Sequence, residues 1–453
     1  MDHSAQSGEK SGEAGLHSVF GQRPWVRLLF RAIFRCLWSA TSSKMKFTPI
    51  STLSRRQFLG GSLAAATAVS LPIKAMQDAA SKPIFDRKIK LGIVGNGGRG
   101  GWIANLFKKH GGYEMRSVAD YFQHVADSCG DAVGVDSTRR FATLSGYKRL
   151  LESGIEALAI ETPPYFMPEI AREAVERGIH VYLAKPVAVD VPGALSIRES
   201  GAMATQRDQV FLVDYQMPTD PVLQEIVRRI HDGALGEIAQ VSTVGITHAM
   251  PELPAGAHPE QRLRDLSWVN DVAYGCDYIG NFDIHAIDAA MWALNDVPVA
   301  AMGESRIRRP APHGDSRDVC SVIYEYANGV VHNHFGQGLA NNSHVTLDAT
   351  IHGTEAMALL HYWGDKAYIR GGPMQYGGKV ENLYEAGAVR NIDRFYHDVT
   401  TGRFDNDTVQ RSVDGVLACV LGYEAAARGE RLTMADVIRE NRRLEIDLSG
   451  LKS

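Results

Sequence analysis

The chain has 453 residues, which is long enough for two or three domains. Its hydrophobic content of 45 % and charged content of 22 % are ordinary for a soluble globular protein. Lysine and arginine number 48 against 52 acidic residues, and the formal net charge of −4 is opposite in sign to that of a typical nucleic-acid-binding surface. We therefore expect no nucleic-acid partner.

The cysteines are scattered, with no Cys-x-x-Cys pair and no histidine at zinc-ligand spacing. We interpret them as small buried apolar residues, and we predict neither a disulfide framework nor a metal site. The five are Cys36, Cys129, Cys276, Cys320 and Cys419.

The stretch Ser54-Arg55-Arg56-Gln57-Phe58-Leu59 precedes a weakly apolar run at residues 60–72. Paired arginines before a modest apolar segment are typical of the twin-arginine export signal of bacteria. We expect residues 45–80 to be such a signal, and the protein to be periplasmic or otherwise exported by that pathway. The alternative is a chance Arg-Arg pair before an alanine-rich helix.

Residues 1–44 fit this signal poorly, because Met45-Lys46 is a more natural start for it. We expect residues 1–44 to be a non-native or disordered extension. The basic amphipathic stretch at 25–38 is too short and too charged to span a bilayer, so no stable membrane span is expected. A helix lying on a membrane surface is the alternative.

Glycines form the pattern Gly-x-Gly-x-x-Gly between an apolar run at 91–94 and a helical pattern that starts at Trp102. A strand, a tight turn and a helix in this order bind the pyrophosphate of a dinucleotide. A second apolar run ends in Asp120, 20 residues after Gly100, where a ribose-binding carboxylate is expected. The alternative is a plain glycine-rich turn. The pattern predicts cofactor contacts from Gly95, Asn96, Gly97, Gly98, Arg99, Gly100 and Asp120.

Apolar strands alternate with helical patterns through residues 86–215. This alternation predicts an α/β domain with a doubly wound parallel sheet and helices on both faces. Ligands of such sheets bind at the carboxyl ends of the strands. The expected strands are 91–94, 115–119, a short one near 140, 157–161, 181–184 and 210–214.

The pattern changes at residue 216, where a helix at 220–231 is followed by longer alternating strands. The turn Ala327-Asn328-Gly329 between two of them indicates a hairpin. We therefore expect residues 216–448 to be an α+β domain with a mainly antiparallel sheet. Its expected strands are 237–247, 319–326, 330–336, 345–353 and 356–362, with terminal helices at 392–400 and 411–428.

Lys185 follows a predicted parallel strand and precedes Pro186, so it should reach the crevice where a ligand binds. There it could hydrogen-bond a substrate hydroxyl and, if partly desolvated, share its proton. A solvated surface lysine is the alternative.

Asn281, His285 and Asp288 have the spacing i, i+4 and i+7, which places them on one face of a helix. A histidine between polar neighbours can act as an acid or base, or orient a substrate. The alternative is a structural histidine that Asp288 holds. One histidine and one aspartate are too few for a metal site.

These features stand in a characteristic order, with Thr162-Pro163-Pro164 and Gly233-Ala-Leu-Gly236 between them. Together they resemble the glucose–fructose oxidoreductase, inositol dehydrogenase and rhizopine-catabolism (Gfo/Idh/MocA) family over residues 88–448. The resemblance implies a Rossmann domain, then an α+β domain with a large open sheet, and bound NAD(P). It also implies oxidation or reduction at a hydroxyl-bearing carbon of a sugar, glycoside or cyclitol.

By this resemblance Lys185 and His285 accept the hydroxyl proton as hydride leaves, and Asp288 orients the imidazole. Asp120 would bind both ribose hydroxyls, which favours NAD over NADP because a 2′-phosphate would meet a carboxylate. Thr162, Pro163 and Lys185 are further expected cofactor contacts. The expected substrate contacts are Tyr165, Tyr215, Gln216, Asn281 and His285.

The chain departs from the family pattern at several positions, among them Met167 in place of a histidine common three residues after Thr-Pro-x, and Met217-Pro-Thr-Asp220 in place of an arginine-rich stretch after Gln216. Ala184 stands where a glutamate usually precedes the Lys-Pro pair, and Asn281 replaces an acidic residue often found four positions before the histidine. We therefore expect an altered proton relay.

The sequence favours an exported NAD(P)-dependent oxidoreductase, with a cofactor that exported relatives hold tightly. One alternative is a glycosidase or lyase of the same fold, in which NAD transiently oxidises a ring carbon. Another is a non-catalytic sensor of sugar or nucleotide. An open sheet face usually pairs with a second copy, so a homo-oligomer (dimer or tetramer) is expected.

Overall fold

The computed structural model describes residues 85–254 and 256–453. The expected extension at 1–44 and export signal at 45–80 lie outside the described residues. None of the helices within 85–254 and 256–453 has the length and apolarity needed to cross a membrane.

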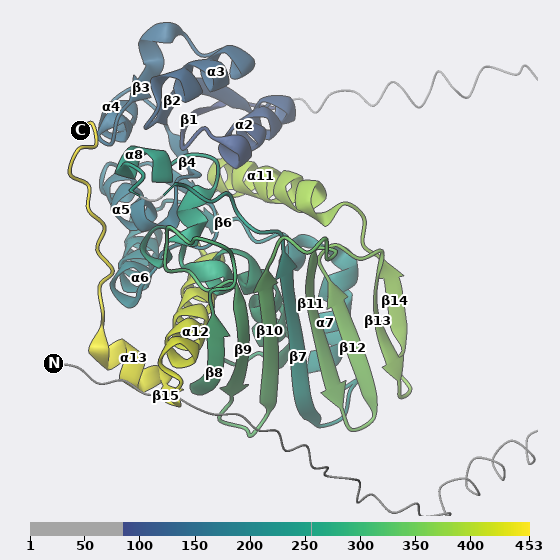
Figure 1. Ribbon diagram of the computed structural model, residues 1–453. Coiled ribbons are helices and arrows are strands. Elements are labelled where there is room, and N and C mark those ends of the chain that lie inside the picture. The colour runs from purple at the N-terminus through teal and green to yellow at the C-terminus, as the bar shows by residue number, and fades with distance from the viewer. Residues whose placement is uncertain (1–84, 255) are drawn as a thin grey trace, which may run out of the picture. The chain divides into compact units, whose positions relative to one another are not determined.

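Six parallel strands form the first sheet, in the order β3-β2-β1-β4-β5-β6. Helices cover both of its faces, which confirms the predicted doubly wound architecture (Figure 1). The central strands are apolar on both faces, as expected for a sheet buried between helices. The elements are β1 (Ile89–Val94), α2 (Gly98–His110), β2 (Tyr113–Asp120), α3 (Gln123–Val133), β3 (Arg140–Ala142), α4 (Gly146–Leu151), β4 (Ala157–Ile160), α5 (Met167–Glu176), β5 (His180–Leu183), α6 (Val191–Gln206) and β6 (Phe211–Val213).

Helix α2 begins at Gly98, four residues before the helical pattern that starts at Trp102. The sequence pattern places the start of this helix too late, because glycines in the first turn have low helix propensity. Gly100 is needed here for space, since a Cβ at this position would collide with the carbonyl oxygen of Gly95. Gly95 itself has φ +81°, a conformation that favours glycine.

Nine strands form the second sheet, in the order β14-β13-β12-β11-β7-β10-β9-β8-β15. Its pairings are antiparallel except between β10 and β7, and the predicted β9–β10 hairpin is confirmed. The strands are β7 (Ile238–Thr247), β8 (Ala300–Arg306), β9 (Val319–Glu325), β10 (Val331–Gly338), β11 (Thr346–Gly353), β12 (Ala356–His361), β13 (Lys366–Gly371), β14 (Tyr376–Lys379) and β15 (Leu432–Thr433).

Helices α7 (Pro221–His231), α10 (Ile284–Leu294) and α12 (Thr408–Arg428) pack against this sheet. Helix α12 also contacts α6, and α11 (Leu383–Thr401) contacts α2, so both join the two sheets. Helix α11 starts nine residues before the predicted 392. The short helices are η2 (Ser137–Arg139), η3 (Pro164–Phe166), η4 (Met217–Thr219), α8 (Pro259–Arg262), η5 (Ser267–Asn270), α9 (Val272–Gly275), η6 (Ile279–Asp283) and α13 (Met434–Glu440).

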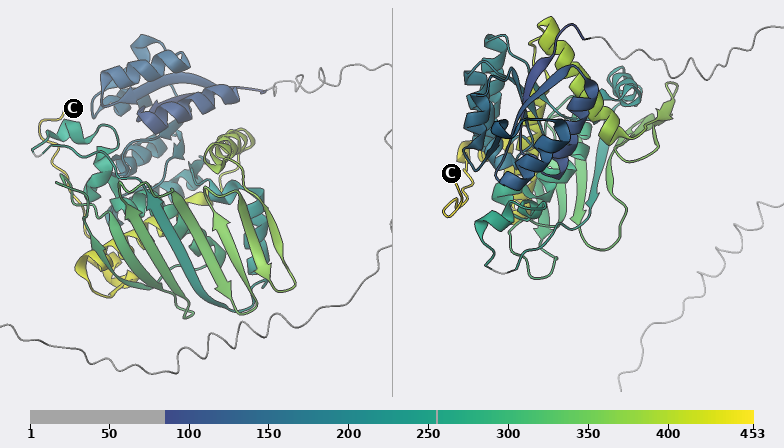
Figure 2. Two further views of the ribbon diagram at one scale, coloured as in Figure 1. Left: turned by 45° about the vertical axis from the view of Figure 1, so that its right-hand side comes forward. Right: turned by 90° about the horizontal axis from the view of Figure 1, so that it is seen from above.

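The other face of the second sheet is open, as the turned view shows (Figure 2). Met302, Ile323, Val331 and Phe335 are exposed on it, each by 39 % or more. Register places Met302 opposite Ile323, and Ile323 opposite Asn333, so these side chains share one face. A second copy of the chain would bind on this exposed apolar surface, and the expected homo-oligomer stays a prediction.

Candidate functional site

The glycine turn after β1 leaves open space where a pyrophosphate would lie. A Cβ placed on Gly97 or Gly98 would meet no atom within 4 Å. Gly97 is the N-cap of α2, and no side chain caps the helix there. The first N–H groups of α2 are therefore free to bind an anion.

Asp120, at the end of β2, is held by main-chain N–H groups. Its Oδ2 accepts from Asn96 N at 2.7 Å and its Oδ1 from Phe122 N at 3.0 Å. Burial raises the pKa of the carboxyl, and these N–H groups act to lower it. The carboxylate is thus fixed in place with lone pairs left for a ligand.

Asp120 lines a cavity of about 290 Å³ together with Gly95, Thr162 and Pro163. The hydroxyl of Thr162 is buried there without a hydrogen-bond partner. Buried polar groups normally have partners, so an unpaired hydroxyl at a cavity wall fits a ligand that supplies one. The residues present fit the adenosine half of a dinucleotide, and the individual cofactor contacts stay predictions.

Arg99 lies in a buried ion cluster at the carboxyl ends of β4 and β6. Its guanidinium pairs with Asp214, and its Nε lies 3.2 Å from Glu161 Oε2. Burial raises the pKa of Glu161 to about 7, although Arg99 acts to lower it. Neither acid was predicted as a site residue, yet both stand where predicted parallel strands end.

Arg99 also stacks on aromatic rings. Its guanidinium lies 5.6 Å from the ring centroid of Trp102 and 5.3 Å from that of Tyr384. A contact between Arg99 and the cofactor stays a prediction. The guanidinium is already paired with the two acids of the ion cluster, Glu161 and Asp214.

Lys185 extends from the end of β5, and its Nζ donates to the carbonyl oxygen of Asn281 at 2.6 Å. Burial, and after it the charge of Arg99, lower the pKa of Lys185 to about 7. A substantial share of this amine is therefore neutral near pH 7, where it can accept a proton.

Asn281 lies in η6, a π-helix over Ile279–Asp283, and α10 begins only at Ile284. The predicted common face of Asn281, His285 and Asp288 assumed one α-helix throughout and is wrong. A π-turn contains more residues than an α-turn, so it rotates Asn281 out of line. The side-chain amide of Asn281 instead donates to Gly275 O at 3.2 Å. The main-chain carbonyl oxygen of Asn281 accepts the hydrogen bond from Lys185 Nζ.

His285 is buried, and its Nδ1 has no hydrogen-bond partner. Its ring centroid lies 4.5 Å from that of Tyr362 and 6.2 Å from that of Tyr215. Burial lowers the pKa of His285 well below its usual value, and the charges of Lys185 and Arg99 act in the same direction. The imidazole is neutral and can accept a hydrogen bond.

Asp288 binds Arg411 of α12, not the imidazole. Arg411 donates from Nε to Oδ1 and from Nη2 to Oδ2, both at 2.6 Å. The expectation that Asp288 orients His285 is therefore wrong. Helical spacing placed Asp288 one turn from His285, but an arginine from a distant helix offers a bidentate charge partner.

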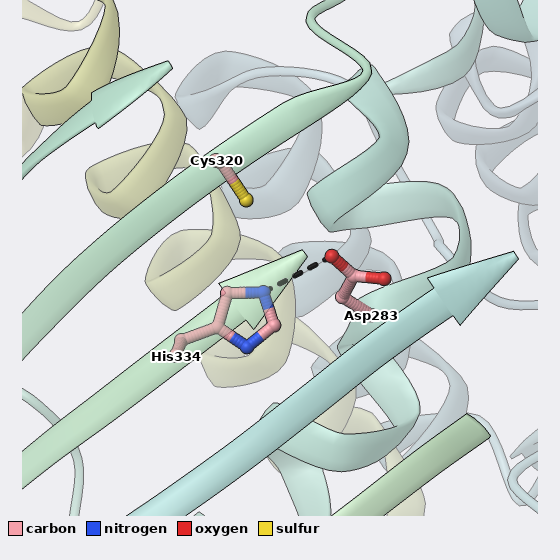
Figure 3. Close-up of side chains that lie close together, drawn as sticks. All are labelled: Asp283, Cys320 and His334. Carbon is pink, nitrogen blue, oxygen red and sulfur yellow. Dashed lines mark hydrogen bonds and ion pairs between the residues drawn. The ribbon is translucent and has the colours of Figure 1, made fainter. Parts of the chain in front are cut away.

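Asp283, Cys320 and His334 converge beneath the π-turn (Figure 3). His334 Nε2 lies 3.0 Å from Asp283 Oδ2, and its Nδ1 lies 2.9 Å from Thr243 Oγ1. A Cβ at Gly245 or Gly336 would collide with the Asp283 carboxylate, so two glycines make room for it.

The donor atoms of these three residues lie within 4.8 Å of one another, so among the described residues this group could hold a metal ion. However, burial raises the pKa of the Cys320 thiol well above its usual value, which opposes the thiolate that a metal prefers. The Asp283 carboxyl and the His334 imidazole already serve as each other's hydrogen-bond partners without a metal ion. Lys185 acts to lower the pKa of Asp283, so this carboxyl is electrostatically coupled to the lysine.

Gln216 positions Tyr362, because its Oε1 accepts from Tyr362 Oη at 2.9 Å and its Nε2 donates to Asp214 O at 3.2 Å. The buried hydroxyl of Tyr215 has no partner. Tyr165 packs edge-on against Phe166 and near Tyr274. Substrate contacts from Tyr165, Tyr215 and Gln216 stay predictions.

Two family models match consecutive parts of the chain. Residues 89–215 match an oxidoreductase family with an NAD-binding Rossmann fold. Residues 223–359 match the GFO/IDH/MocA C-terminal domain. Together the two ranges take in more than half of the chain.

Among curated proteins, the chain is similar to inositol 2-dehydrogenase 4 of Saccharopolyspora erythraea, with 24 % identity over 248 residues. That alignment covers 54 % of this chain and 66 % of the relative. The uncharacterized oxidoreductase YfiI of Bacillus subtilis is 24 % identical over 45 % of this chain and 51 % of its own length. The chain thus spans between half and two thirds of these relatives.

Among solved structures, an inositol dehydrogenase homolog of Azotobacter vinelandii complexed with NAD⁺ has a TM-score of 0.64 and 19 % identity, over 77 % of this chain and 98 % of that one. The aldose-aldose oxidoreductase of Caulobacter crescentus has a TM-score of 0.61 and 17 % identity, over 77 % of this chain and 100 % of that one. At these identities the likeness shows the fold alone.

Proposed function

Because the chain belongs to the Gfo/Idh/MocA family of oxidoreductases, we propose that it transfers hydride between NAD and a hydroxyl-bearing carbon of a sugar, glycoside or cyclitol. The observation that carries this proposal is the pair of Lys185 and His285 at the carboxyl end of the parallel sheet. His285 is buried and Lys185 is half-buried, and the pKa values of both are lowered by desolvation and by neighbouring cations. The names of the relatives support the substrate class.

Bound NAD would supply the hydride acceptor. The neutral amine of Lys185 then takes the proton of the substrate hydroxyl, and the carbonyl of Asn281 keeps Nζ in position. The imidazole of His285 accepts a hydrogen bond from the same or a neighbouring hydroxyl, because it is neutral and its Nδ1 is free. The charge gained by Lys185 is stabilised by the coupled carboxyl of Asp283.

The function is tested by purifying the protein, supplying NAD⁺, and adding a panel of sugars, glycosides and cyclitols. Lasting near-ultraviolet absorbance of reduced nicotinamide, with an oxidised product in mass spectra, is the expected result. Cleavage of a glycoside without net reduction would favour the redox-assisted glycosidase or lyase. Bound nucleotide with no reaction across the panel would favour a sensor and contradict the proposal.

Replacing Asp120 by serine should weaken NAD binding by about 10- to 100-fold, because two hydrogen bonds from ribose hydroxyls to a carboxylate are lost. NADP binding should improve relative to NAD, since its 2′-phosphate no longer meets a carboxylate. Dissociation constants for both cofactors, from fluorescence titration, check this. Asp127→Ser, on the outer surface of α3, is the matched control. An unchanged preference between the cofactors would contradict the assignment.

Export by the twin-arginine pathway is part of the proposed function, and it rests on Arg55-Arg56 and the apolar run that follows. This pathway carries folded proteins, which suits a protein that leaves the cytoplasm with its cofactor bound. In a bacterial host, Arg55→Lys combined with Arg56→Lys should retain the protein in the cytoplasm. Equal periplasmic amounts of both forms, measured by cell fractionation, would contradict export by this route.

A further inference from the structure

The chain after α13 runs back across the molecule as an extended segment, residues 441–453, called here the C-terminal strap. Figure 1 shows it in yellow, rising from α13 to the end marked C beside α4. Leu444, Ile446 and Leu448 are half-buried, while Glu445 and Asp447 between them are exposed. This alternation is typical of an extended segment that packs one side on a surface.

Main-chain hydrogen bonds fix the strap to the first domain. Leu444 N donates to Asp190 Oδ2 at 2.8 Å, near the start of the strap. Near its end, Lys452 N donates to Tyr121 Oη at 3.1 Å, and Leu144 N donates to Lys452 O at 3.0 Å. Tyr121 and Leu144 follow β2 and β3, so the strap ends beside the loops that border the adenosine cavity.

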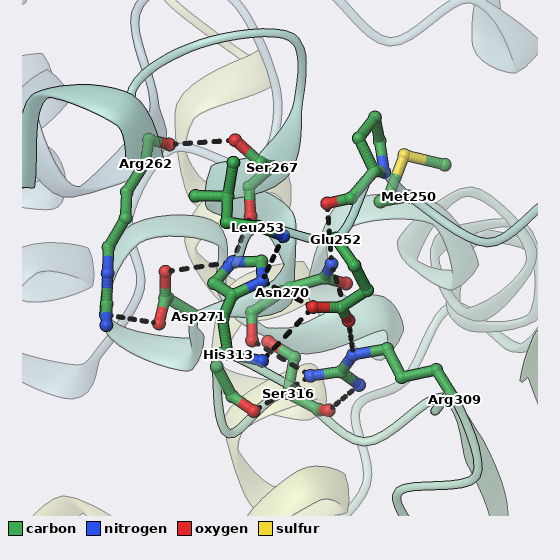
Figure 4. A network of polar contacts seen from close by, with 12 residues as sticks. Met250, Glu252, Leu253, Arg262, Ser267, Asn270, Asp271, Arg309, His313 and Ser316 are labelled. Carbon is green, nitrogen blue, oxygen red and sulfur yellow. Dashed lines mark hydrogen bonds and ion pairs between the residues drawn. The ribbon is translucent and has the colours of Figure 1, made fainter. Parts of the chain in front are cut away.

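The strap also contacts the second domain, where the segment that holds α8, η5 and α9 and the loop between β8 and β9 form a wall held together by polar contacts (Figure 4). In this wall Arg309 pairs with Glu252, and His313 Nδ1 lies 2.5 Å from Glu252 Oε2. Arg262, at the end of α8, donates to Asp271 Oδ1 at 2.9 Å.

Two contacts bring the strap against this wall. A Cβ on Gly450 would lie 3.1 Å from His258 Nε2. Residues 445–447 of the strap and Arg262 of the wall line one cavity of about 620 Å³. The strap therefore bridges the two domains.

The cavity that holds Asp120 and Thr162 is also lined by Leu448 and Ser453 of the strap, and by Leu263 beside α8. Its walls thus come from the glycine turn, from the loops after β2 and β3, and from the strap. A ligand seated against Asp120 would therefore meet the strap along one wall of the cavity.

We infer that the C-terminal strap completes the adenosine-binding site and slows the release of NAD, because it forms one wall of the cavity of Asp120 and its main chain is hydrogen-bonded to Tyr121 and Leu144. This inference rests on the proposed function, since it needs NAD in that cavity. It gives a physical basis for a cofactor that stays with the protein.

Deletion of residues 444–453 should raise the rate of NAD release about tenfold or more, since barriers to dissociation act mainly on the off-rate. The measurement loads the full chain and the deletion variant with NAD, adds a competing excess of a fluorescent nucleotide analogue, and follows exchange. Melting of both proteins without nucleotide shows whether the deletion variant is folded. Equal or slower release from a folded deletion variant would overturn the inference.

A second pair of variants tests the strap without shortening it. Lys452→Pro removes the N–H that Tyr121 Oη accepts, whereas Lys452→Ala removes only an exposed side chain and keeps that bond. Release should be several-fold faster from the proline variant than from the alanine variant. Equal rates from the pair would overturn the inference alone. Failure of the full chain to bind any NAD would instead overturn the proposed function.

Discussion

Replacement of Lys185 by methionine is expected to lower kcat by about 10³-fold while leaving NAD bound, because a positioned general base contributes about 10²- to 10⁴-fold. Methionine keeps the length of the side chain but cannot accept the proton of a substrate hydroxyl. Lys185→Arg should be as inactive, since a guanidinium stays protonated and cannot act as a base. Steady-state kinetics with the best substrate of the panel, beside a titration of NAD, measure both effects.

The pH profile gives an independent readout of the same residue. The pKa of Lys185 is lowered to about 7, so the amine is charged below that pH and neutral above it. For oxidation of the alcohol, kcat/KM should therefore rise with pH and level off above about pH 7. Lys366→Met, on β13, is the matched control and should keep the wild-type profile. Retained activity in Lys185→Met, or a flat profile in the wild type, would contradict the role of this lysine.

Replacement of Arg411 by methionine should lower the free energy of unfolding by about 3–5 kcal/mol, the usual cost of leaving one partner of a buried ion pair without the other. Asp288 is buried at the end of two 2.6 Å hydrogen bonds from Arg411. Arg411 acts to lower the pKa of Asp288, which burial raises, so the carboxyl should take up a proton once the arginine is gone. Urea unfolding followed by circular dichroism measures the change.

The control for this prediction is the double variant Arg411→Met with Asp288→Leu. Replacing both partners of a buried pair by apolar side chains removes the uncompensated charge, so most of the lost stability should return. If the single variant loses less than about 1 kcal/mol, the pair does not act as a buried ion pair. If the double variant is no more stable than the single one, other contacts of Arg411, such as its stacking on Trp292, account for the loss.

Local patterns were sufficient to predict the architecture. Three features of the first domain lie close together in the sequence: the strand that ends at Val94, the glycine turn and Asp120. Each is required by the local geometry of a dinucleotide-binding turn, which is the same in any chain. The hairpin through Gly329 is equally local, because its positive φ favours glycine. The family, the fold and the NAD-binding domain could therefore be predicted from the sequence.

The site departs from the sequence-based prediction where partners come from distant segments. Arg411 is 123 residues from Asp288, and no spacing rule joins them. The same holds for Asp283 and His334, which only the second sheet brings together. The π-turn at Asn281 was missed because a regular 3.6-residue period was assumed across it. The alternation at residues 444–448 indicates an extended segment, but the surface it packs on is set by main-chain hydrogen bonds to distant residues, which leave no signal in the sequence.

Hydride transfer from the substrate carbon to NAD is tested most directly by following the hydrogen atom itself. The best sugar or cyclitol of the panel is synthesised with deuterium on the carbon that is oxidised, and is mixed with protein loaded with NAD⁺. The cofactor is then extracted and examined by mass spectrometry. Reduced cofactor that carries one deuterium is expected in the wild type, and almost none in Lys185→Met. Reduced cofactor without deuterium, or oxidised product with the cofactor unchanged and unlabelled, would contradict hydride transfer at this site.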